Sequence, residues 1–455
     1  TQTPCSMARG VSSIPAGAVL ALAFLALMHT PVFASDVAVP DNGCTATLTE
    51  VAALPTEGNS GFEAWVEGED IRLIAANLWD GINPLMESGS WIYNVSGDKD
   101  GVLTVNKLQR IPTTGATQAK YIPGPNGRDM LMINNYMKCG GKEEATARER
   151  PPCGPTSVYV PDGPGWADYK SLRTVGPTKS EYIYVGGGAL WISVVENFMD
   201  QVSLWQFQRQ DNNFDRRASM RVHAASDAVP TLVDDTLYFT VASKQSEKGS
   251  NNSACVLFAL VDGSLMQVGA LPAFGTSDLE TIKFKGEDWL FVANERTEAT
   301  VMINSHVYKF DKTGWAAFQD IPTTGARGGH FFIVGEDLWL GVANFGDMKH
   351  GKVESKSSLW RLNKEDQKFE RMVEVDSFGA TNWRHFTIKG HHFLALANQG
   401  HLTAKKYQTS YIYRLDTTCG GGDGSTPTRA QPMEEPLPPV PPAPEALPET
   451  PKSEL

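Results

Sequence analysis

Oxygen-bearing side chains recur in this sequence at positions where they could bind a cation. Asp80, Asp200 and Asp347 each lie three residues after an asparagine, and calcium prefers such carboxylate and amide oxygens. If these positions converge on one opening, they predict a calcium site in a central channel. A structural role for the asparagines is the alternative that we favour, because asparagine caps backbone groups at strand ends, and it requires no cofactor. The recurring asparagines are Asn77, Asn135, Asn197, Asn294, Asn344 and Asn398.

Motifs of catalytic centres are absent from the sequence. It contains no His-Glu-x-x-His, no Gly-x-Ser-x-Gly, no phosphate-binding glycine-rich loop and no Cys-x-x-Cys. His391 and His392 are adjacent, and neighbouring residues of a strand point to opposite faces, so the two cannot bind one ion together. We therefore predict that the protein is not an enzyme.

The asparagines belong to an internal repeat. Each follows a glycine by 19 to 21 residues, as Gly325 precedes Asn344, and the hexapeptide IPTTGA occurs at both 111–116 and 321–326. The interval from Gly176 to Gly275 is twice the usual one, so we place an eroded unit there, with Ser226 in place of the glycine. The sequence thus predicts seven units. The other turn glycines are Gly58, Gly115 and Gly379.

Each unit offers four short strands and no helical periodicity. Runs such as 288–294 and 393–398 are apolar on both faces, so both faces must be covered. Repeated four-stranded units of this kind predict an all-β protein with a seven-bladed β-propeller fold. The last unit lacks its fourth strand, and the strand expected at 44–55 has no unit of its own. We predict that this N-terminal strand closes the ring.

Ring closure would bring Cys44 and Cys419 together, and we predict a disulfide between them. In the chain-entropy model such a long loop contributes on the order of 4–5 kcal/mol. A second disulfide, between Cys139 and Cys153, is expected to brace one loop, and Cys255 is expected to be a buried free thiol. Asn251 and Asn94 match the glycosylation pattern, and Asn251 is preferred because it lies in a polar loop.

Three regions are expected along the chain. Residues 1–34 form a signal peptide region, with the signal starting at Met7, and no other run is long enough to span a membrane. Residues 44–419 form the propeller, and residues 420–455 form a Gly/Pro-rich disordered tail. We expect a secreted protein. The alternative is the endoplasmic reticulum lumen, because the sequence ends in Lys-Ser-Glu-Leu.

The repeat resembles the EAR repeat, also called the EPTP or epitempin repeat. The residues that carry the resemblance are Phe318, Gln319, Ile321, Thr323, Gly325 and Ala326. The resemblance implies a seven-bladed propeller of a secreted or cell-surface protein that binds other extracellular proteins. Relatives with a leucine-rich-repeat domain bind receptor ectodomains through the propeller, but this chain lacks that domain.

Loops that follow the Ala-Asn strands are the most variable segments, and equivalent loops of a propeller emerge on one face. We predict that this face binds an extracellular protein or a cell-surface receptor, and a glycan is the alternative partner. The net charge of −12 argues against nucleic acid. The candidate residues on these loops are Trp79, Tyr136, Phe345, Lys349, Lys352, Lys356, Lys405 and Lys406.

Overall fold

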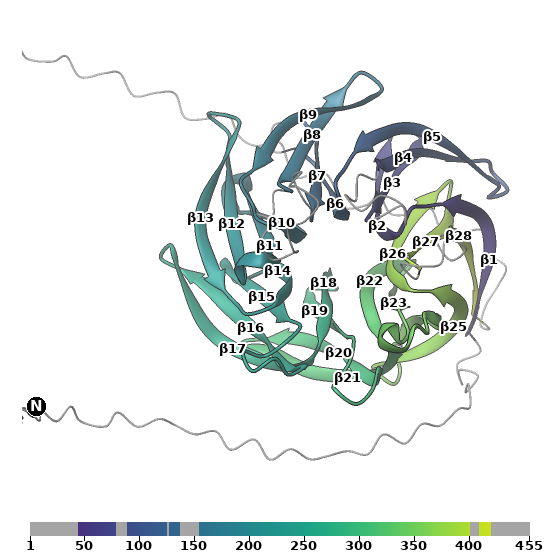
Figure 1. The fold of residues 1–455 in the computed structure, drawn as a ribbon. Coiled ribbons are helices and arrows are strands. Elements are labelled where there is room, and N and C mark those ends of the chain that lie inside the picture. Colours follow the sequence, from purple (N-terminus) through teal and green to yellow (C-terminus); the bar gives the residue numbers. More distant parts are fainter. Residues whose placement is uncertain (1–43, 79–88, 125–126, 137–153, 401–408, 420–455) are drawn as a thin grey trace, which may run out of the picture. The chain divides into compact units, whose positions relative to one another are not determined.

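The computed structural model describes residues 44–78, 89–124, 127–136, 154–400 and 409–419. Seven four-stranded antiparallel sheets are arranged as the blades of a β-propeller (Figure 1). The innermost strands, β2, β6, β10, β14, β18, β22 and β26, form a closed cycle in which each contacts the innermost strand of the next blade. The all-β, seven-bladed fold is therefore confirmed. No helix of the described residues is long and apolar enough to span a membrane.

The blades follow one another along the chain. Blades one to three contain β2 (Asn59–Glu67), β3 (Asp70–Asn77), β4 (Gly89–Gly97), β5 (Leu103–Pro112), β6 (Ala116–Ile122), β7 (Met130–Asn135), β8 (Thr156–Asp162), β9 (Gly165–Leu172), β10 (Pro177–Val185), β11 (Ala189–Glu196), β12 (Gln201–Gln208) and β13 (Asn213–Arg221). Blades four and five contain β14 (Ala225–Val233), β15 (Thr236–Ser243), β16 (Asn252–Val261), β17 (Ser264–Phe274), β18 (Thr276–Phe284), β19 (Glu287–Asn294), β20 (Met302–Asp311) and β21 (Gly314–Thr324). Blades six and seven contain β22 (Ala326–Val334), β23 (Asp337–Asn344), β24 (Glu354–Asn363), β25 (Lys368–Phe378), β26 (Ala380–Ile388), β27 (His391–Asn398), β28 (Thr409–Cys419) and β1 (Cys44–Pro55).

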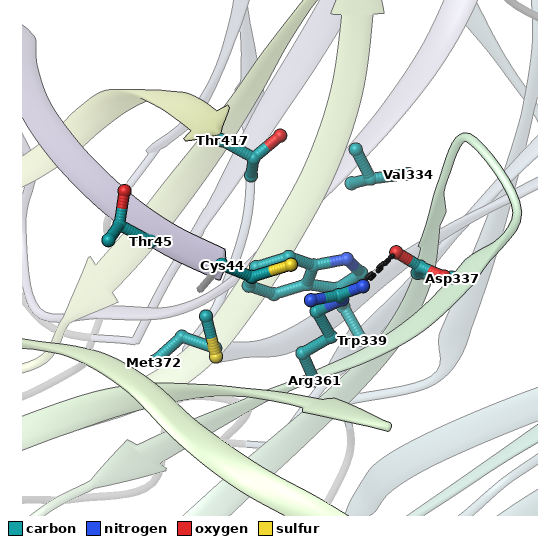
Figure 2. Close-up of a pocket in the computed structure, with 8 residues that line it drawn as sticks. All are labelled: Cys44, Thr45, Val334, Asp337, Trp339, Arg361, Met372 and Thr417. Carbon is teal, nitrogen blue, oxygen red and sulfur yellow. Dashed lines mark hydrogen bonds and ion pairs between the residues drawn. The ribbon is translucent and has the colours of Figure 1, made fainter. Parts of the chain in front are cut away.

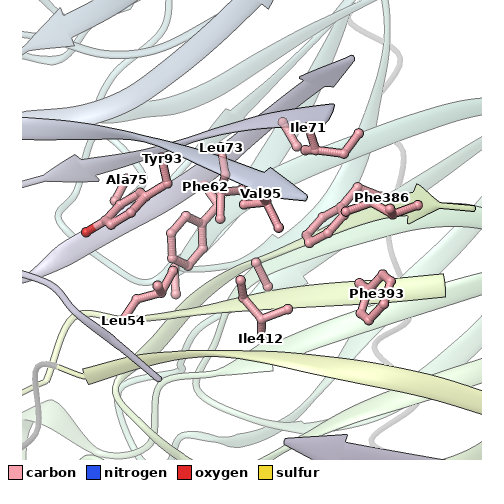
Figure 3. Close-up of a cluster of buried hydrophobic side chains, with 14 residues drawn as sticks. Leu54, Phe62, Ile71, Leu73, Ala75, Tyr93, Val95, Phe386, Phe393 and Ile412 are labelled. Atoms are coloured by element: carbon pink, nitrogen blue, oxygen red, sulfur yellow. The ribbon is translucent and has the colours of Figure 1, made fainter. Parts of the chain in front are cut away.

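The apolar core is divided among the interfaces between blades. The described residues form seven clusters of buried side chains, and each joins the facing sides of two adjacent blades. Figure 3 shows the cluster between blades seven and one, where Phe62 of β2 lies near Leu54 of β1 and Phe386 of β26. The second strands are mostly apolar because both of their faces are covered, and all six residues of β7, its two asparagines included, are buried.

The N-terminal strand closes the ring as predicted. Strand β1 pairs antiparallel with β28, from Cys44 opposite Cys419 to Pro55 opposite Thr409. This pairing supplies the outermost strand of blade seven, so the first and last segments of the propeller share one sheet. The backbone register thus places the two cysteines directly across from each other. Cys255 is a buried free cysteine, as expected, and burial raises the pKa of its thiol to about 12. Cys139 and Cys153 lie outside the described residues.

A left-handed turn residue precedes every innermost strand. Six of these residues are the predicted glycines, with φ between 58° and 63°. In blade four the residue is Ala224, with φ of 47°. The carbonyl of Ala224 accepts the backbone N–H of Lys244, just as the carbonyl of Gly325 accepts that of Phe345. The assignment of this position to Ser226 is therefore wrong. The turn residue of blade four is identified by its backbone hydrogen bond, and the sequence pattern could not show it because the residue is not glycine.

The turn residues generate a prediction about stability. A residue with a β-carbon is strained in the left-handed region, so Ala224→Gly should relieve this strain. Glycine also makes the unfolded chain more flexible, which offsets part of the gain, and the net stabilisation should be about 0.5–1 kcal/mol. Gly325→Ala should destabilise it more strongly, because the new β-carbon would lie 2.3 Å from the carbonyl oxygen of Gly346. Denaturant unfolding of both variants measures the two changes. A less stable Ala224→Gly protein would contradict the assignment of the turn.

The register of β1 generates a second prediction. Non-reducing peptide mapping should recover a cross-linked peptide that contains Cys44 and Cys419, and the Cys44→Ser/Cys419→Ser protein should melt at a lower temperature because its unfolded chain is less constrained. Cys255 is the internal control, since it should react with a thiol reagent only after denaturation. Free thiols at Cys44 and Cys419 in the native protein would exclude the disulfide.

Candidate functional site

The loops after the second strands and the turns before the innermost strands lie at one end of the ring, which we call the loop face. Hydrogen bonds join neighbouring blades there: Thr381 donates to the carbonyl of Asn59 at 3.1 Å, and Ser226 donates to the carbonyl of Thr276 at 2.6 Å. The segments between second and third strands range from 4 to 20 residues. At the opposite end, eight described turns are only two residues long. Variation is therefore concentrated on the loop face.

The recurring asparagines hold this face together. Asn344 accepts the backbone N–H of Thr324 at 3.1 Å and donates to the carbonyl of Lys356 at 2.7 Å, which ties its own strand to the turn and to the third strand. Asn77, Asn135, Asn294 and Asn398 make the equivalent bonds. The preferred structural role of these asparagines is confirmed.

Blade three departs from the predicted pattern. Glu196, the last residue of β11, accepts the N–H of Val175 at 2.9 Å, which is the bond that asparagine makes elsewhere. Asn197 lies one residue later, in the short helix η2 (Asn197–Met199), and donates instead to the carbonyl of Ala225. The inclusion of Asn197 in the repeat was therefore wrong by one position. The spacing of 21 residues, longer than in the other units, was the available signal.

The aspartates proposed for calcium make local contacts. The Asp200 carboxylate accepts the backbone N–H of Ala224 at 2.8 Å, and its Oδ2 lies 3.0 Å from Nδ1 of His223. Asp347 caps the short helix η3 (Met348–His350), and the hydrogen bond with His350 lowers the pKa of Asp347. Asp80 lies outside the described residues. Within the described ranges, no group of three His, Cys, Asp or Glu side chains could hold a metal ion.

The predicted aromatic and basic loop residues fall into different environments. Phe345 is only 2% exposed, because the guanidinium of Arg327 covers its ring at 3.5 Å, so its assignment to the binding surface is wrong. Tyr136 is half-buried and stacks on Phe198 at 5.1 Å. Three of the predicted lysines are exposed on the loop face: Lys349, Lys352 and Lys356. Trp79, Lys405 and Lys406 lie outside the described residues.

The two glycosylation candidates also differ in their surroundings. Asn94 lies within β4, and its side-chain amide donates to Asp70 at 3.0 Å. Asn251 is half-buried in the loop before β16, and its backbone N–H donates to Glu298. Glycosylation at either position stays a prediction.

Apolar residues that the sequence analysis did not select are exposed on the loop face. Phe198 and Met199 of η2 are each 49% exposed, Met302 at the start of β20 is 52% exposed, and Met348 of η3 is 42% exposed. Methionine adapts its shape to different partners, which makes it common at binding surfaces. The signal missed in the sequence was the placement of these residues within the variable loops.

Arg327 organises the loop face around blades five to seven. It pairs with Glu295 at 2.8 Å, bonds to Gln399 at 3.3 Å and covers Phe345. Although burial opposes ionisation, Arg327 and Lys244 lower the pKa of Glu295 to about 2. Loops of several blades are thus tied to one guanidinium, and they form a stiff base for the exposed residues.

A ring of charged side chains lines the axis of the propeller. The fifth residue after each turn residue belongs to this ring, and six of the seven are titratable: Glu63, Lys120, Glu181, Glu280, His330 and Arg384, with Val229 in blade four. Glu63 and Arg384 pair across blades at 2.7 Å, and Lys120 and Glu181 pair at 2.5 Å. We call this set the axial ring.

A second set of charged residues lies two positions nearer the turns. Lys179 pairs with Asp278 at 2.6 Å, and Asp227 accepts the backbone N–H groups of Ala228 and Leu279. Together with the axial ring, these residues place five carboxylates (Glu63, Glu181, Asp227, Asp278 and Glu280) against three permanent cations (Lys120, Lys179 and Arg384).

Burial in this space, together with the neighbouring charges, changes the protonation of these groups. Burial raises the pKa of Glu280 to about 7, and Asp278 adds to the shift while Lys120 and Arg384 oppose it. Burial also raises the pKa of Asp227 well above its usual range. Burial, with Arg384 and Lys120, lowers the pKa of His330 well below its usual range, so His330 is neutral at pH 7. Its Nδ1 lies 3.0 Å from the Glu280 carboxyl.

The described part of the chain includes two small cavities. One, of about 30 Å³, is lined by the axial ring, and the other, of about 40 Å³, lies at the seam between blades six and seven. Figure 2 shows the second, where Arg361 bonds to Asp337 beside Trp339 and Cys44. Both have room for a few water molecules and are far below the several hundred Å³ of typical ligand pockets.

Comparisons with known proteins agree with this architecture. Residues 368–416, which extend from β25 to β28, match the model of the EPTP domain. The human thrombospondin-type laminin G domain and EAR repeat-containing protein is 35% identical over 109 residues, which are 24% of this chain and 15% of that protein. Its mouse counterpart is 32% identical over 94 residues, 21% of this chain and 14% of that protein. The matches thus span a small part of these relatives, and they confirm the resemblance to EAR-repeat proteins.

Solved structures show more distant similarity. A crystal structure of a protein from Lactobacillus plantarum has a TM-score of 0.48 and 11% identity, and covers 72% of this chain and 89% of its own. BBS1N, in the crystal structure of its complex with ARL6DN, has a TM-score of 0.48 and 12% identity, and covers 81% of this chain and 97% of its own. Neither similarity is close enough to support a functional argument.

The axial ring generates a prediction about pH. The pKa of Glu280 is raised from 4.5 to about 7, so between these pH values the folded state keeps a proton that the unfolded state has lost. The contribution of Glu280 to the stability of the folded protein therefore falls as the pH rises from about 4.5 through 7. Glutamine resembles the protonated form. Relative to the original protein, Glu280→Gln should therefore match its stability near pH 5 and exceed it by up to about 3 kcal/mol at pH 8.

Denaturant unfolding between pH 5 and pH 8 measures this difference. The other titrating groups are common to both proteins and largely cancel. Glu336→Gln is the matched control, because Glu336 is an exposed turn residue whose side chain is 83% accessible. A difference between Glu280→Gln and the original protein that stays constant with pH would contradict the prediction.

Proposed function

We propose that this chain is a secreted, non-catalytic EAR-type propeller that binds an extracellular protein through its loop face. The exposed Phe198, Met199, Met302 and Met348, which lie in or beside loops of variable length, are the observation that carries the proposal. Exposed apolar residues on a rigid scaffold are typical of binding surfaces, because burying them against a partner is favourable. The relatives with EAR repeats support the same class of protein.

The contacts on the loop face divide it into two candidate parts. Phe198 stacks on Tyr136 in the region of blades two and three, and the exposed Met199 follows it in η2. Met348 lies beside Arg327 in the region of blade six, together with the exposed Lys349 and Lys352. Apolar anchors next to basic residues fit a protein surface that combines apolar and acidic groups.

A glycan is a weaker alternative. Binding of a sugar ring needs exposed aromatic faces, and Phe345 is covered by Arg327 while Tyr136 uses one face to stack on Phe198. Calcium is also a weaker proposal, because Asp200 and Asp347 are already engaged by local partners. We therefore place protein binding first.

A panel of purified extracellular ectodomains, measured against the immobilised protein by surface plasmon resonance, tests the proposal. For an ectodomain that binds, Phe198→Asp/Met199→Asp or Met348→Asp should raise the Kd by about tenfold or more, since each puts an unpaired charge into the interface. Val66→Asp/Val102→Asp is the matched control, because these residues are 49% and 63% exposed at the opposite end of the ring. Binding that only the control weakens, or that none of these variants changes, would contradict a role for the loop face.

A further inference from the structure

Two histidines meet where blade seven packs against blade six. Nε2 of His385, on β26, lies 3.0 Å from Nδ1 of His392, on β27, and their rings stack with centroids 5.2 Å apart. The two residues are diagonal neighbours on one face of the sheet. The His385 ring also stacks on Phe332 of β22, in blade six, at 4.8 Å. We call His385 and His392 the histidine pair, and it contributes directly to the contact between the two blades.

The same two positions carry different chemistry in the other blades. His385 lies six residues after its turn glycine, and His392 lies six residues before Asn398. In blade two these positions hold Tyr121 and Asp129, which are hydrogen-bonded at 2.7 Å. Imidazole is the side chain that titrates in mildly acidic solution, so this position responds to acid in blade seven alone. The remaining blades have Ala64, Tyr182, Pro230, Thr281 and Phe331 at the position of His385.

The close contact within the histidine pair requires at least one neutral ring. One of the two facing nitrogens donates its hydrogen, and the other accepts it with a lone pair. If both rings were protonated, two N–H groups would face each other and the hydrogen bond would be lost. The two positive charges would also repel each other at this short separation.

The charged and titratable groups that act on the histidine pair oppose its protonation. Arg384 precedes His385 on β26, and His330 lies on β22, on the blade-six side of the contact. Both disfavour a positive charge on His385, and His391 of β27 disfavours one on His392. A proton added to the pair would therefore meet bases and a cation.

Carboxylates on the strands around the histidine pair have other partners. The ion pairs are Glu63 (β2) with Arg384 at 2.7 Å, Asp337 (β23) with Arg361 at 2.8 Å and Asp416 (β28) with Arg414 at 3.0 Å. Glu280 of β18 lies 3.0 Å from His330. Each of these carboxylates is thus engaged away from the pair and does not compensate a charge on it.

We propose that protonation of the histidine pair separates blades six and seven locally at acidic pH, while the interfaces between the other blades stay closed. Burial, together with His392, His330 and Arg384, lowers the pKa of His385 well below its usual range, and burial also lowers that of His392. As the pH falls below about 6.5, the opened state therefore binds protons that the closed state does not, so the closed state loses stability. This trend is opposite in sign to that of Glu280.

Amide hydrogen exchange of the full chain tests this inference independently of the proposed function. The chain is labelled at about pH 7.5 and about pH 5, with times corrected for the intrinsic effect of pH on exchange. At the lower pH we expect peptides from β22, β23, β26 and β27 to lose about tenfold or more protection relative to peptides from blades two to four, because one unit of pKa shift is a tenfold change in the opening equilibrium. An equal loss in every blade, or no loss, would overturn the inference.

Two single variants show whether the histidine pair causes the opening. His385→Phe keeps the stack on Phe332 without an ionisable ring, so it should abolish the loss of protection at the lower pH. His392→Gln keeps a hydrogen-bonding partner for His385 but removes the second charge, so it should reduce the loss.

His306→Gln is the matched control, because His306 is a strand histidine whose Nδ1 lies 2.7 Å from the carboxylate of Asp320. This variant should leave the acid response of blades six and seven unchanged. Circular dichroism at neutral pH shows which variants are folded. An opening that stays as large in the folded His385→Phe or His392→Gln protein as in the original would overturn the inference.

Discussion

Closure of the ring is the constraint on which the rest of this structure depends. Each apolar cluster is built from two blades, so no blade can bury its own faces, and one open interface would expose apolar surface on both sides. The pairing of β1 with β28 completes the seventh sheet. It also places Leu54 in the cluster that seals blades seven and one. Because these contacts join the two ends of the propeller, folding must overcome the entropy cost of closing a very long loop.

The closed ring leaves two different surfaces for function. At the axis, the innermost strands bring charged side chains into a small space, where they neutralise one another and retain protons that exposed carboxylates would lose. That space has room for a few water molecules but not for a substrate-sized molecule. On the loop face, segments of different length are supported by asparagine caps and by Arg327, and they vary without disturbing the sheets. Recognition of a partner therefore fits the loop face, and the axial ring fits a structural role that depends on pH.

Prediction from the sequence was accurate where the local backbone or burial favours one type of residue for a physical reason. A left-handed turn favours glycine, and a strand covered on both faces favours apolar residues, so the blade number, the strands and the closing strand could all be predicted. It was wrong where the tertiary structure overrode that preference. Ala224 adopts the left-handed turn that was assigned to Ser226, and Glu196 replaces the asparagine assigned as Asn197. Phe345 looked like a surface aromatic, but Arg327, 18 positions earlier, covers it.

The sequence by itself determined the repeat, the order of strands and the closure of the propeller, because these follow from spacing and hydrophobic pattern within units of about fifty residues. Only the tertiary structure decided which side chains meet at the axis. The residues of the axial ring come one from each blade and look unrelated in sequence, yet they become neighbours because each lies five positions after its turn residue. Their protonation depends on distances between blades and on burial, and neither quantity is present in the local sequence.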